Sequence, residues 1–302
     1  MEIISVIPRG YCQGVVRAIQ IAKNTVRENP HVPVTMLGMI VHNQYVVHAC
    51  QQLGIRFVEE AGRSRIDLLD DINEGIVIFT AHGVSDDVRQ KALCKGLTAV
   101  DATCPDVIKS HELVRAHCAD HGDVLYIGKQ GHPEAEGTVS LSDRVHLITC
   151  CADIEKLNHL NHVLITNQTT LSLLDCQRII DACLKKYPQA QIASEICPAT
   201  RIRQQAVMHL KNIDLLIVVG DVRSNNSHQL KEIGLSSGIP EAVLIDSIQD
   251  LTIDMIKEKD RIAVTSGSST PSELTKQVID FLQEYAQDPH WKNPPQTAEV
   301  KI

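Results

Sequence analysis

The chain has 302 residues, a formal net charge of −8 and only 3% aromatic residues. An acidic chain without a basic stripe or stacking side chains is a poor nucleic-acid binder. No apolar run reaches the roughly 18 residues that span a membrane, and the N-terminal segment lacks the basic leader of a signal peptide. We therefore expect a cytoplasmic protein with two or three domains that contacts neither membrane nor nucleic acid.

The first predicted elements are a strand at residues 2–7 and an amphipathic helix after Cys12. The apolar side chains of this helix share one face: Val15, Ile19, Ala22 and Val26. Pro30 ends the helix, and the next strand ends at Gly38. A further strand runs into the polar turn TAHGVS, which contains His82. The order after Cys12 is therefore helix, strand ending in glycine, and strand ending in a polar turn.

The same order of elements occurs two more times along the chain. Cys104 follows the extended segment TAVDA and Cys197 follows QIASEI, and the proline after each cysteine suits the first turn of a helix. The next strand again ends in glycine, at Gly128 and at Gly220. Cys12 and Cys104 are 92 residues apart, and Cys104 and Cys197 are 93 apart. The sequence therefore contains three diverged copies of one α/β unit.

Alternating strands and helices predict parallel sheets with helices on their faces, so the fold class is α/β. The third copy lacks a strand after its last helix, which ends near Tyr285, and we expect the N-terminal strand to supply it. Three similar α/β domains would then form a pseudo-threefold trefoil. The expected boundaries are 14–104 for the first domain, 105–197 for the second, 1–13 plus 198–285 for the third, and 286–302 for an irregular tail that Trp291 would dock.

Polar residues follow the strands at two places in each copy. Those after the glycines include His42, Asn43, His132, Glu134, Ser224, Asn225 and Asn226. Those in the later turns include His82, Thr169, Thr170, Ser268 and Ser269. In parallel α/β folds, ligands bind at the carboxyl ends of the strands. We therefore expect these side chains and the three turn cysteines to face one centre.

Three converging cysteines would offer soft thiolate ligands to a metal. A structural zinc ion would want a fourth protein ligand, whereas a [4Fe–4S] cluster with three cysteine ligands leaves one iron open to bind a substrate oxygen. The surrounding imidazoles, hydroxyls and carboxamides would suit a strongly anionic group, and one carboxyl would deliver protons. Five other cysteines lie in predicted helices and are expected to be small buried residues: Cys50, Cys94, Cys118, Cys176 and Cys183.

Taken together, the motifs resemble those of the LytB/IspH family of 4-hydroxy-3-methylbut-2-enyl diphosphate reductases. In chain order they are GYCQGV, VHN, TAHGVS, DATCP, GHPEAEGT, TNQTTLS, EICPATRIRQ, SNNS and SGSSTP. The resemblance implies a three-domain α/β trefoil around one central [4Fe–4S] cluster. It also implies removal of the substrate's allylic hydroxyl with two electrons and two protons, which gives isopentenyl and dimethylallyl diphosphate as the last step of the non-mevalonate pathway.

The resemblance also implies a role for each matching residue. The cluster ligands are Cys12, Cys104 and Cys197. The residues that bind the diphosphate are His42, His82, His132, Ser224, Asn226 and Ser269. Thr169 lies near the substrate hydroxyl, and Glu134 is the acid of the proton relay. Asn225 stands where many members have a second serine, and because an amide can still donate a hydrogen bond to phosphate, we expect it to bind there too. An external ferredoxin or flavodoxin would supply the electrons.

Simpler explanations remain open for some of these residues. The serines and threonines of TTLS and SSTP would cap helices, and Glu134 would be a first-turn acid that the helix dipole stabilises. Both explanations are compatible with binding, because a helix start is also a good anion site. Two other functions remain as alternatives. One is a cluster-containing sensor or electron carrier, and the other is a zinc-dependent hydrolase, for which the chain has no HExxH or HxxEH pattern.

Overall fold

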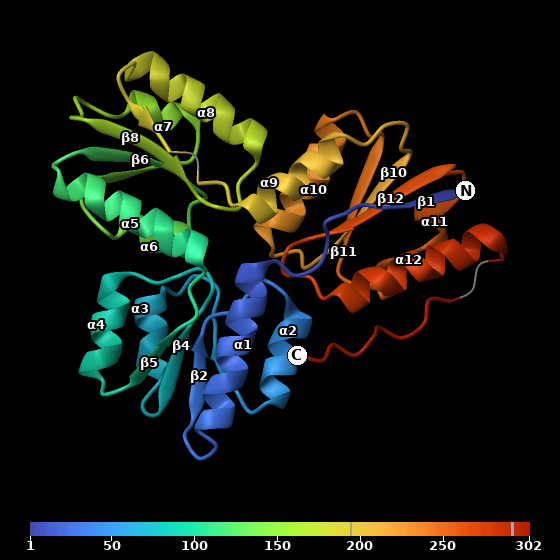
Figure 1. Ribbon diagram of the computed structural model, residues 1–302, viewed down its shortest axis with the longest axis horizontal. Coiled ribbons are helices and arrows are strands. Elements are labelled where there is room, and N and C mark those ends of the chain that lie inside the picture. The colour runs from blue at the N-terminus through green and yellow to red at the C-terminus, as the bar shows by residue number, and fades with distance from the viewer. Residues whose placement is uncertain (194, 291–292) are drawn as a thin grey trace. The chain divides into compact units, whose positions relative to one another are not determined.

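A computed structural model describes residues 1–193, 195–290 and 293–302 (Figure 1). Its strands form three four-stranded sheets, and every pairing among the described strands is parallel. The chain divides into two compact units. The first holds Met1–Val15, His42–Ala49 and Pro198–Ile302, and the second holds Val16–Val41 and Cys50–Cys197. The boundaries of the three expected domains stay a prediction, and Trp291 lies outside the described residues.

The first sheet has the strand order β3-β2-β4-β5. Its strands are β2 Val34–Leu37, β3 Arg56–Val58, β4 Ile76–Phe79 and β5 Thr98–Asp101. The helices of this part of the chain are α1 Gln13–Glu28, α2 Gln44–Gln52, α3 Arg65–Leu68, the 3-10 helix η1 Leu69–Asp71 and α4 Asp86–Cys94. Helix α1 begins directly after Cys12 and ends two residues before Pro30, as predicted.

The second sheet has the strand order β7-β6-β8-β9. Its strands are β6 Asp123–Ile127, β7 Val145–Ile148, β8 Val163–Asn167 and β9 Gln191–Ile192. Its helices are α5 Pro105–Ala119, α6 Pro133–Val139, α7 Cys151–Glu155 and α8 Leu173–Lys186. Strand β9 is much shorter than the extended segment expected before Cys197.

The third sheet has the order β11-β10-β12-β1 and contains the N-terminal strand, as expected (Figure 1). Its strands are β1 Glu2–Ser5, β10 Leu215–Val219, β11 Glu241–Ile245 and β12 Arg261–Ser266. Its helices are α9 Pro198–Met208, α10 Asn225–Ser236, η2 Ile248–Asp250, α11 Ile253–Ile256 and α12 Ser272–Gln287. All three sheets thus place their strands in the same order, which confirms the internal repeat at the level of topology.

Alternate residues of the central strands pack on opposite faces of the sheet, as in parallel sheets that are covered on both sides. In β10, Leu215, Ile217 and Val219 belong to the core that contains α12. Leu216 and Val218 belong to the core that contains α9 and α10. Strand β6 is divided in the same way between α8 on one face and α5 and α6 on the other. Burial on both faces explains why these strands are continuous apolar runs.

The two central strands of each sheet end at the same level, which brings the two polar segments of each copy to one edge. The last paired residues are Leu37 with Phe79, Ile127 with Asn167, and Val219 with Ser266. At Gly38 the chain has a φ of +94°, and a Cβ there would overlap the guanidinium of Arg65. Only glycine fits such a position without strain, so the first strand-end glycine is required by geometry.

The C-terminal tail packs on the first compact unit. Helix α12 ends at Gln287, two residues beyond the expected end. Beyond it, the backbone N–H of Ala298 donates to the Gln277 side chain over 3.0 Å, and Val300 is buried in the same core as α12.

Within the described part of the chain, no helix is both long and apolar enough to cross a membrane.

Candidate active site

The turn cysteines occupy equivalent places in the three sheets. Cys12, Cys104 and Cys197 each stand immediately before a helix, at the starts of α1, α5 and α9. Each cysteine also donates its backbone N–H to a carbonyl in the polar turn after the neighbouring strand. The acceptors are Ser268 for Cys12 at 3.0 Å, Ala81 for Cys104 at 2.9 Å and Thr169 for Cys197 at 3.1 Å. The repeat therefore extends to the hydrogen bonds that hold the cysteines.

The chemical setting of these three thiols differs from that of the buried ones. Cys12, Cys104 and Cys197 are all partly exposed. Burial raises the pKa of Cys50 and of Cys176 to about 12, so these thiols stay protonated and are poor metal ligands. The three turn cysteines therefore fit the role of ligands to an iron–sulfur cluster.

The other helical cysteines are only partly as expected. Cys50, Cys176 and Cys183 are buried, which agrees with the prediction. Cys94 is exposed, so for it the prediction of a buried residue was wrong, whereas Cys118 is partly buried and packs against a core of the second sheet. The buried residues of α4 are Val88 and Ala92, and Cys94, two positions after Ala92, lies on another side of the helix.

Glu134 and Thr169 form a buried pair in the second sheet. Glu134 is in the first turn of α6, and Thr169 follows β8. The backbone N–H of Thr169 donates to one carboxyl oxygen of Glu134 over 2.7 Å, and the Thr169 hydroxyl donates to the other over 3.0 Å. The Glu134 side chain is 2% exposed. Glu134 is thus a first-turn acid of α6, as the simpler explanation has it, and it is also fixed by a residue 35 positions away.

The burial of Glu134 controls its charge. Loss of hydration raises the pKa of this carboxyl from 4.5 to about 7, although the two hydrogen bonds from Thr169 act in the opposite direction. The negative charge of Asp106 adds a smaller increase. A carboxyl with a pKa near neutrality carries a proton for much of the time and can release it, as a general acid must. When Glu134 is protonated, the hydrogen bond can reverse, so that the acid donates to the Thr169 hydroxyl.

Two histidines lie next to this pair. His132 precedes α6, and its Nδ1 accepts the backbone N–H of Glu134 over 3.2 Å. An Nδ1 that accepts places the proton of the neutral ring on Nε2, which makes Nε2 a donor. His82 packs edge-on against His132 with the ring centroids 5.5 Å apart. The second sheet and the turn after β4 thus bring an acid, a hydroxyl and two imidazoles together.

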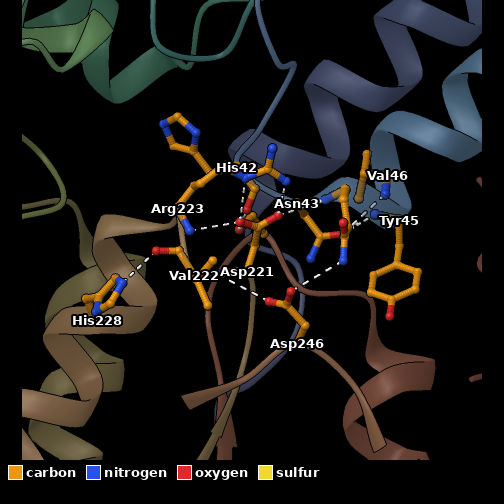
Figure 2. A network of polar contacts seen from close by, with 11 residues as sticks. His42, Asn43, Tyr45, Val46, Asp221, Val222, Arg223, His228 and Asp246 are labelled. Carbon is orange, nitrogen blue, oxygen red and sulfur yellow. Dashed lines mark hydrogen bonds and ion pairs between the residues drawn. The ribbon is translucent and has the colours of Figure 1, made fainter. Parts of the chain in front are cut away.

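Other predicted residues meet in the first compact unit, at the end of the third sheet. The hydroxyl of Ser269 donates to the backbone carbonyl of His42 over 3.0 Å. Figure 2 shows that Asn43, the next residue, caps α2, and its side-chain oxygen accepts the N–H groups of Tyr45 at 3.1 Å and Val46 at 3.2 Å. The turn that carries His42 is therefore fixed on both sides.

The segment Ser224, Asn225 and Asn226 forms the start of α10. Ser224 caps the helix and accepts the N–H of Ser227 over 3.3 Å. Asn226 is 4% exposed, and neither polar atom of its carboxamide has a hydrogen-bond partner among the described residues. A buried amide without a partner is costly, so it points to a ligand. A helix start provides an anion site in the same place. The expectation that the three turn cysteines and the two polar segments of each copy all face one centre stays a prediction.

Sequence reasoning missed one pair of charged residues in this region. Asp221 and Arg223 directly precede Ser224, and their side chains are paired at 2.6 Å. Asp221 also accepts the backbone N–H of Gln44 over 3.0 Å. The letters DVR after Gly220 were the available signal, but two charges so close in sequence are more often solvated than buried.

One protein family matches almost the whole chain. The model of the LytB protein family matches residues 3–283. 4-Hydroxy-3-methylbut-2-enyl diphosphate reductase from Geobacillus kaustophilus is 44% identical over 309 residues, which cover 100% of this chain and 97% of the relative. The reductase of the same name from Brevibacillus brevis is 47% identical over 290 residues, which cover 94% of this chain and 92% of the relative.

Two solved structures are similar to this one. The E-1-hydroxy-2-methyl-but-2-enyl-4-diphosphate reductase from Plasmodium falciparum has a TM-score of 0.87 and 30% identity, and the match covers 98% of this chain and 95% of that one. A structure of (E)-4-hydroxy-3-methyl-but-2-enyl diphosphate reductase, the terminal enzyme of the non-mevalonate pathway, has a TM-score of 0.65 and 27% identity. That match covers 94% of this chain and 100% of the other. The α/β fold expected from the sequence is confirmed.

Proposed function

This chain belongs to the LytB family of 4-hydroxy-3-methylbut-2-enyl diphosphate reductases, and we propose that Glu134, Thr169, the three turn cysteines and the polar residues around them carry out its reaction. The reaction removes the allylic hydroxyl of the substrate. Two electrons and two protons enter, the C–O bond breaks and water leaves. The products are isopentenyl and dimethylallyl diphosphate, so the enzyme completes the non-mevalonate pathway.

The proposed cofactor is a [4Fe–4S] cluster held by Cys12, Cys104 and Cys197. Such a cluster supplies electrons and, with one iron not bound by cysteine, a Lewis acid for a substrate oxygen. The equivalent backbone hydrogen bonds of the three cysteines support this assignment, as does their place before helices. The chain's own contribution is to hold three thiolates at equivalent points of three similar sheets.

The observation that carries the proposal is the buried Glu134–Thr169 pair. A departing hydroxyl needs a proton to leave as water, and the remaining allyl group needs another. Glu134 holds a proton near neutral pH because of its burial, and Thr169 can pass it from the carboxyl to a substrate oxygen. The pair thus provides the acid at a position from which bulk water is excluded.

The diphosphate is proposed to bind to three histidines and to the start of α10. His42, His82 and His132 would donate from imidazole nitrogens. The hydroxyls and amides of Ser224, Asn225, Asn226 and Ser269 would complete the set. The buried carboxamide of Asn226, without a partner among the described residues, supports this assignment most directly. The electron donor is proposed to be an external ferredoxin or flavodoxin, and the compartment the cytoplasm.

The test is purification without oxygen, followed by reduction of the diphosphate substrate with a chemical electron donor. We expect brown protein that contains iron and sulfide and forms both five-carbon diphosphates. Brown protein that takes up electrons but does not consume the substrate would instead indicate an electron carrier or sensor. Colourless protein with bound zinc would contradict the cofactor assignment.

A further inference from the structure

Asp221 is a buried carboxylate at the end of β10 with no part in the proposed chemistry. It is 2% exposed. One oxygen accepts the backbone N–H of Arg223 at 2.8 Å and its Nε at 2.9 Å, and the other accepts the Arg223 guanidinium at 2.6 Å. The second oxygen also accepts the backbone N–H of Gln44 at 3.0 Å. Asp221 thus connects the turn after β10, which contains Arg223, to the first residue of α2, Gln44. Figure 2 shows the carboxylate beside Arg223.

Asp246, which follows β11, adds a second connection between the same segments. Its carboxylate accepts the backbone N–H of Val222 over 3.2 Å and the side-chain amide of Gln44 over 3.3 Å (Figure 2). His228 lies within 2.6 Å of the Val222 carbonyl through a ring nitrogen. The turn after β10 and the first residue of α2 are therefore held by two carboxylates that follow the adjacent strands β10 and β11.

The two connected segments both carry proposed diphosphate ligands. Gln44 is the first residue of α2 and comes two residues after His42. Arg223 directly precedes Ser224, which begins the run that ends at Asn226. Since a main-chain hydrogen bond fixes backbone position, Asp221 sets the distance between the His42 turn and the start of α10.

Arg223 explains why a negative charge is tolerated beside an anion site. An isolated carboxylate there would repel a diphosphate. The guanidinium forms two parallel hydrogen bonds with Asp221 and cancels its charge. A neutral asparagine could not replace Asp221, because its amide nitrogen would face one of the N–H donors.

We propose that Asp221, neutralised by Arg223, is a positioning residue that holds the His42 turn and the α10 start at the spacing that a diphosphate needs. The proposal rests on the proposed function, because it takes the diphosphate to bind to these two segments. Asp221 itself does not touch the substrate. Its effect is on affinity and not on the proton or electron steps.

The test compares Asp221→Asn with the wild-type enzyme. We expect KM for the diphosphate substrate and the inhibition constant of inorganic pyrophosphate to rise together by about tenfold, a typical effect of losing a charge-assisted hydrogen bond. We expect kcat to change less than about threefold and the iron content to stay the same. If Asp221 acted only through its charge, its neutralisation would leave Arg223 positive, and both constants would fall.

The matched control is Asp214→Asn. Asp214 accepts the backbone N–H groups of Asp260 at 2.9 Å and Arg261 at 2.8 Å, at the opposite end of the same sheet. We expect this variant to lower the melting temperature and leave KM and pyrophosphate inhibition unchanged. If Asp221→Asn also lowers only the melting temperature, Asp221 is merely structural and the proposal is wrong.

A milder variant covers the case in which Asp221→Asn does not fold. Arg223→Lys keeps the charge but loses the two parallel hydrogen bonds, and we expect a rise in both constants of about two- to fivefold. Unchanged constants in this variant would overturn the proposal. A wild-type enzyme that fails to reduce the substrate would contradict the proposed function instead, so the two failures are distinct.

Discussion

Glu134 and Asp221 are both 2% exposed, and both follow the first central strand of a sheet, yet their charges are controlled in opposite directions. Burial raises the pKa of each carboxyl. At Glu134 the hydrogen bonds from Thr169 lower the pKa by less than burial raises it, so the pKa is about 7. At Asp221, burial is outweighed by hydrogen bonds from Arg223, so the pKa is held below its usual value. The charge of a buried carboxyl is thus set by its partner and not by depth alone.

This difference matches the two proposed roles. A carboxyl that keeps its proton near neutral pH can deliver it, and Glu134 has only uncharged donors. A carboxylate that stays ionised can accept several hydrogen bonds at once and hold a backbone in place, as Asp221 does. In the two proposals, one kind of side chain thus serves chemistry in one sheet and positioning in another.

The largest expected effect is loss of the proposed cluster, which would stop turnover whatever the two carboxyls do. Cys104→Ser should lose most of the iron and nearly all turnover, since a serine oxygen is a harder and poorer ligand for iron than a thiolate. Cys118→Ser on the same helix is the control and should keep both. Iron content, the visible spectrum and turnover are the measurements. Equal results for the two variants would show that Cys104 is not a ligand.

The second prediction tests the chemical half of the comparison. Glu134→Gln keeps the shape of the side chain but removes the acid, and loss of a positioned general acid costs about 10²–10⁴ in rate. We expect the brown colour and substrate binding to persist while turnover falls by at least the lower factor. Glu136→Gln, an exposed neighbour on α6, should be nearly normal. The proton-relay role would be ruled out if Glu136→Gln were inactive and Glu134→Gln active.

The third prediction concerns two proposed diphosphate ligands, His132, which precedes Glu134 by two residues, and His42, which precedes Gln44 by two residues. His132→Ala and His42→Ala should each weaken substrate binding about ten- to a hundredfold, because a hydrogen bond to a charged group contributes roughly 1.5–3 kcal/mol. The visible spectrum should not change. The control is His146→Ala. His146 is on β7 and lies near Asp123 of β6, and this variant should bind the substrate normally. Unaltered affinity in both test variants would place the diphosphate elsewhere.

The smallest expected effect is a change of pH dependence. The proposed acid role requires Glu134 to be protonated, so turnover should fall as the pH rises through its pKa of about 7. Thr169→Val removes a hydrogen bond that favours the ionised form, so the pKa rises further. The alkaline limb of kcat should therefore move up by roughly 0.5–1 pH unit, on top of any loss in rate.

The control for this shift is Thr138→Val. The Thr138 hydroxyl donates to the backbone carbonyl of Glu134 over 2.8 Å and does not touch its carboxyl. The pH profile of this variant should match that of the wild type in the position of its alkaline limb. A limb that moves down in Thr169→Val would mean that Thr169 does not stabilise the ionised form of Glu134.

Much of the fold could be predicted because local rules and the repeat agree. Gly38, Gly128 and Gly220 mark strand ends, and a cysteine marks the start of a helix in each copy. The short β9 could not be foreseen, since the length of an edge strand depends on its neighbour. The exposure of Cys94 was also missed, although Val88 and Ala92 mark the buried face of α4 and Cys94 lies two positions beyond Ala92, on another side.

The candidate site was predicted as a set of residue types more than as a set of contacts. Motif matching placed Glu134 and Thr169 in one relay, and the structure shows that they are hydrogen bonded. Motif matching could not reveal the surroundings of Asp221. The bond from Gln44 to Asp221 joins residues 177 positions apart, and no local pattern encodes such a contact.

The pairing of β1 with β12 has a consequence for the synthesis of the chain. Gly10, after β1, donates to the side chain of Ser266, which is 256 residues away. At about 5–20 residues per second, the ribosome needs roughly 13–50 s between the two segments. Cys12 is held by the same turn through Ser268, so assembly of the proposed cluster would have to wait until Ser268 has been synthesised. Nascent chains arrested before residue 261 should accordingly leave their first strand open to proteolysis.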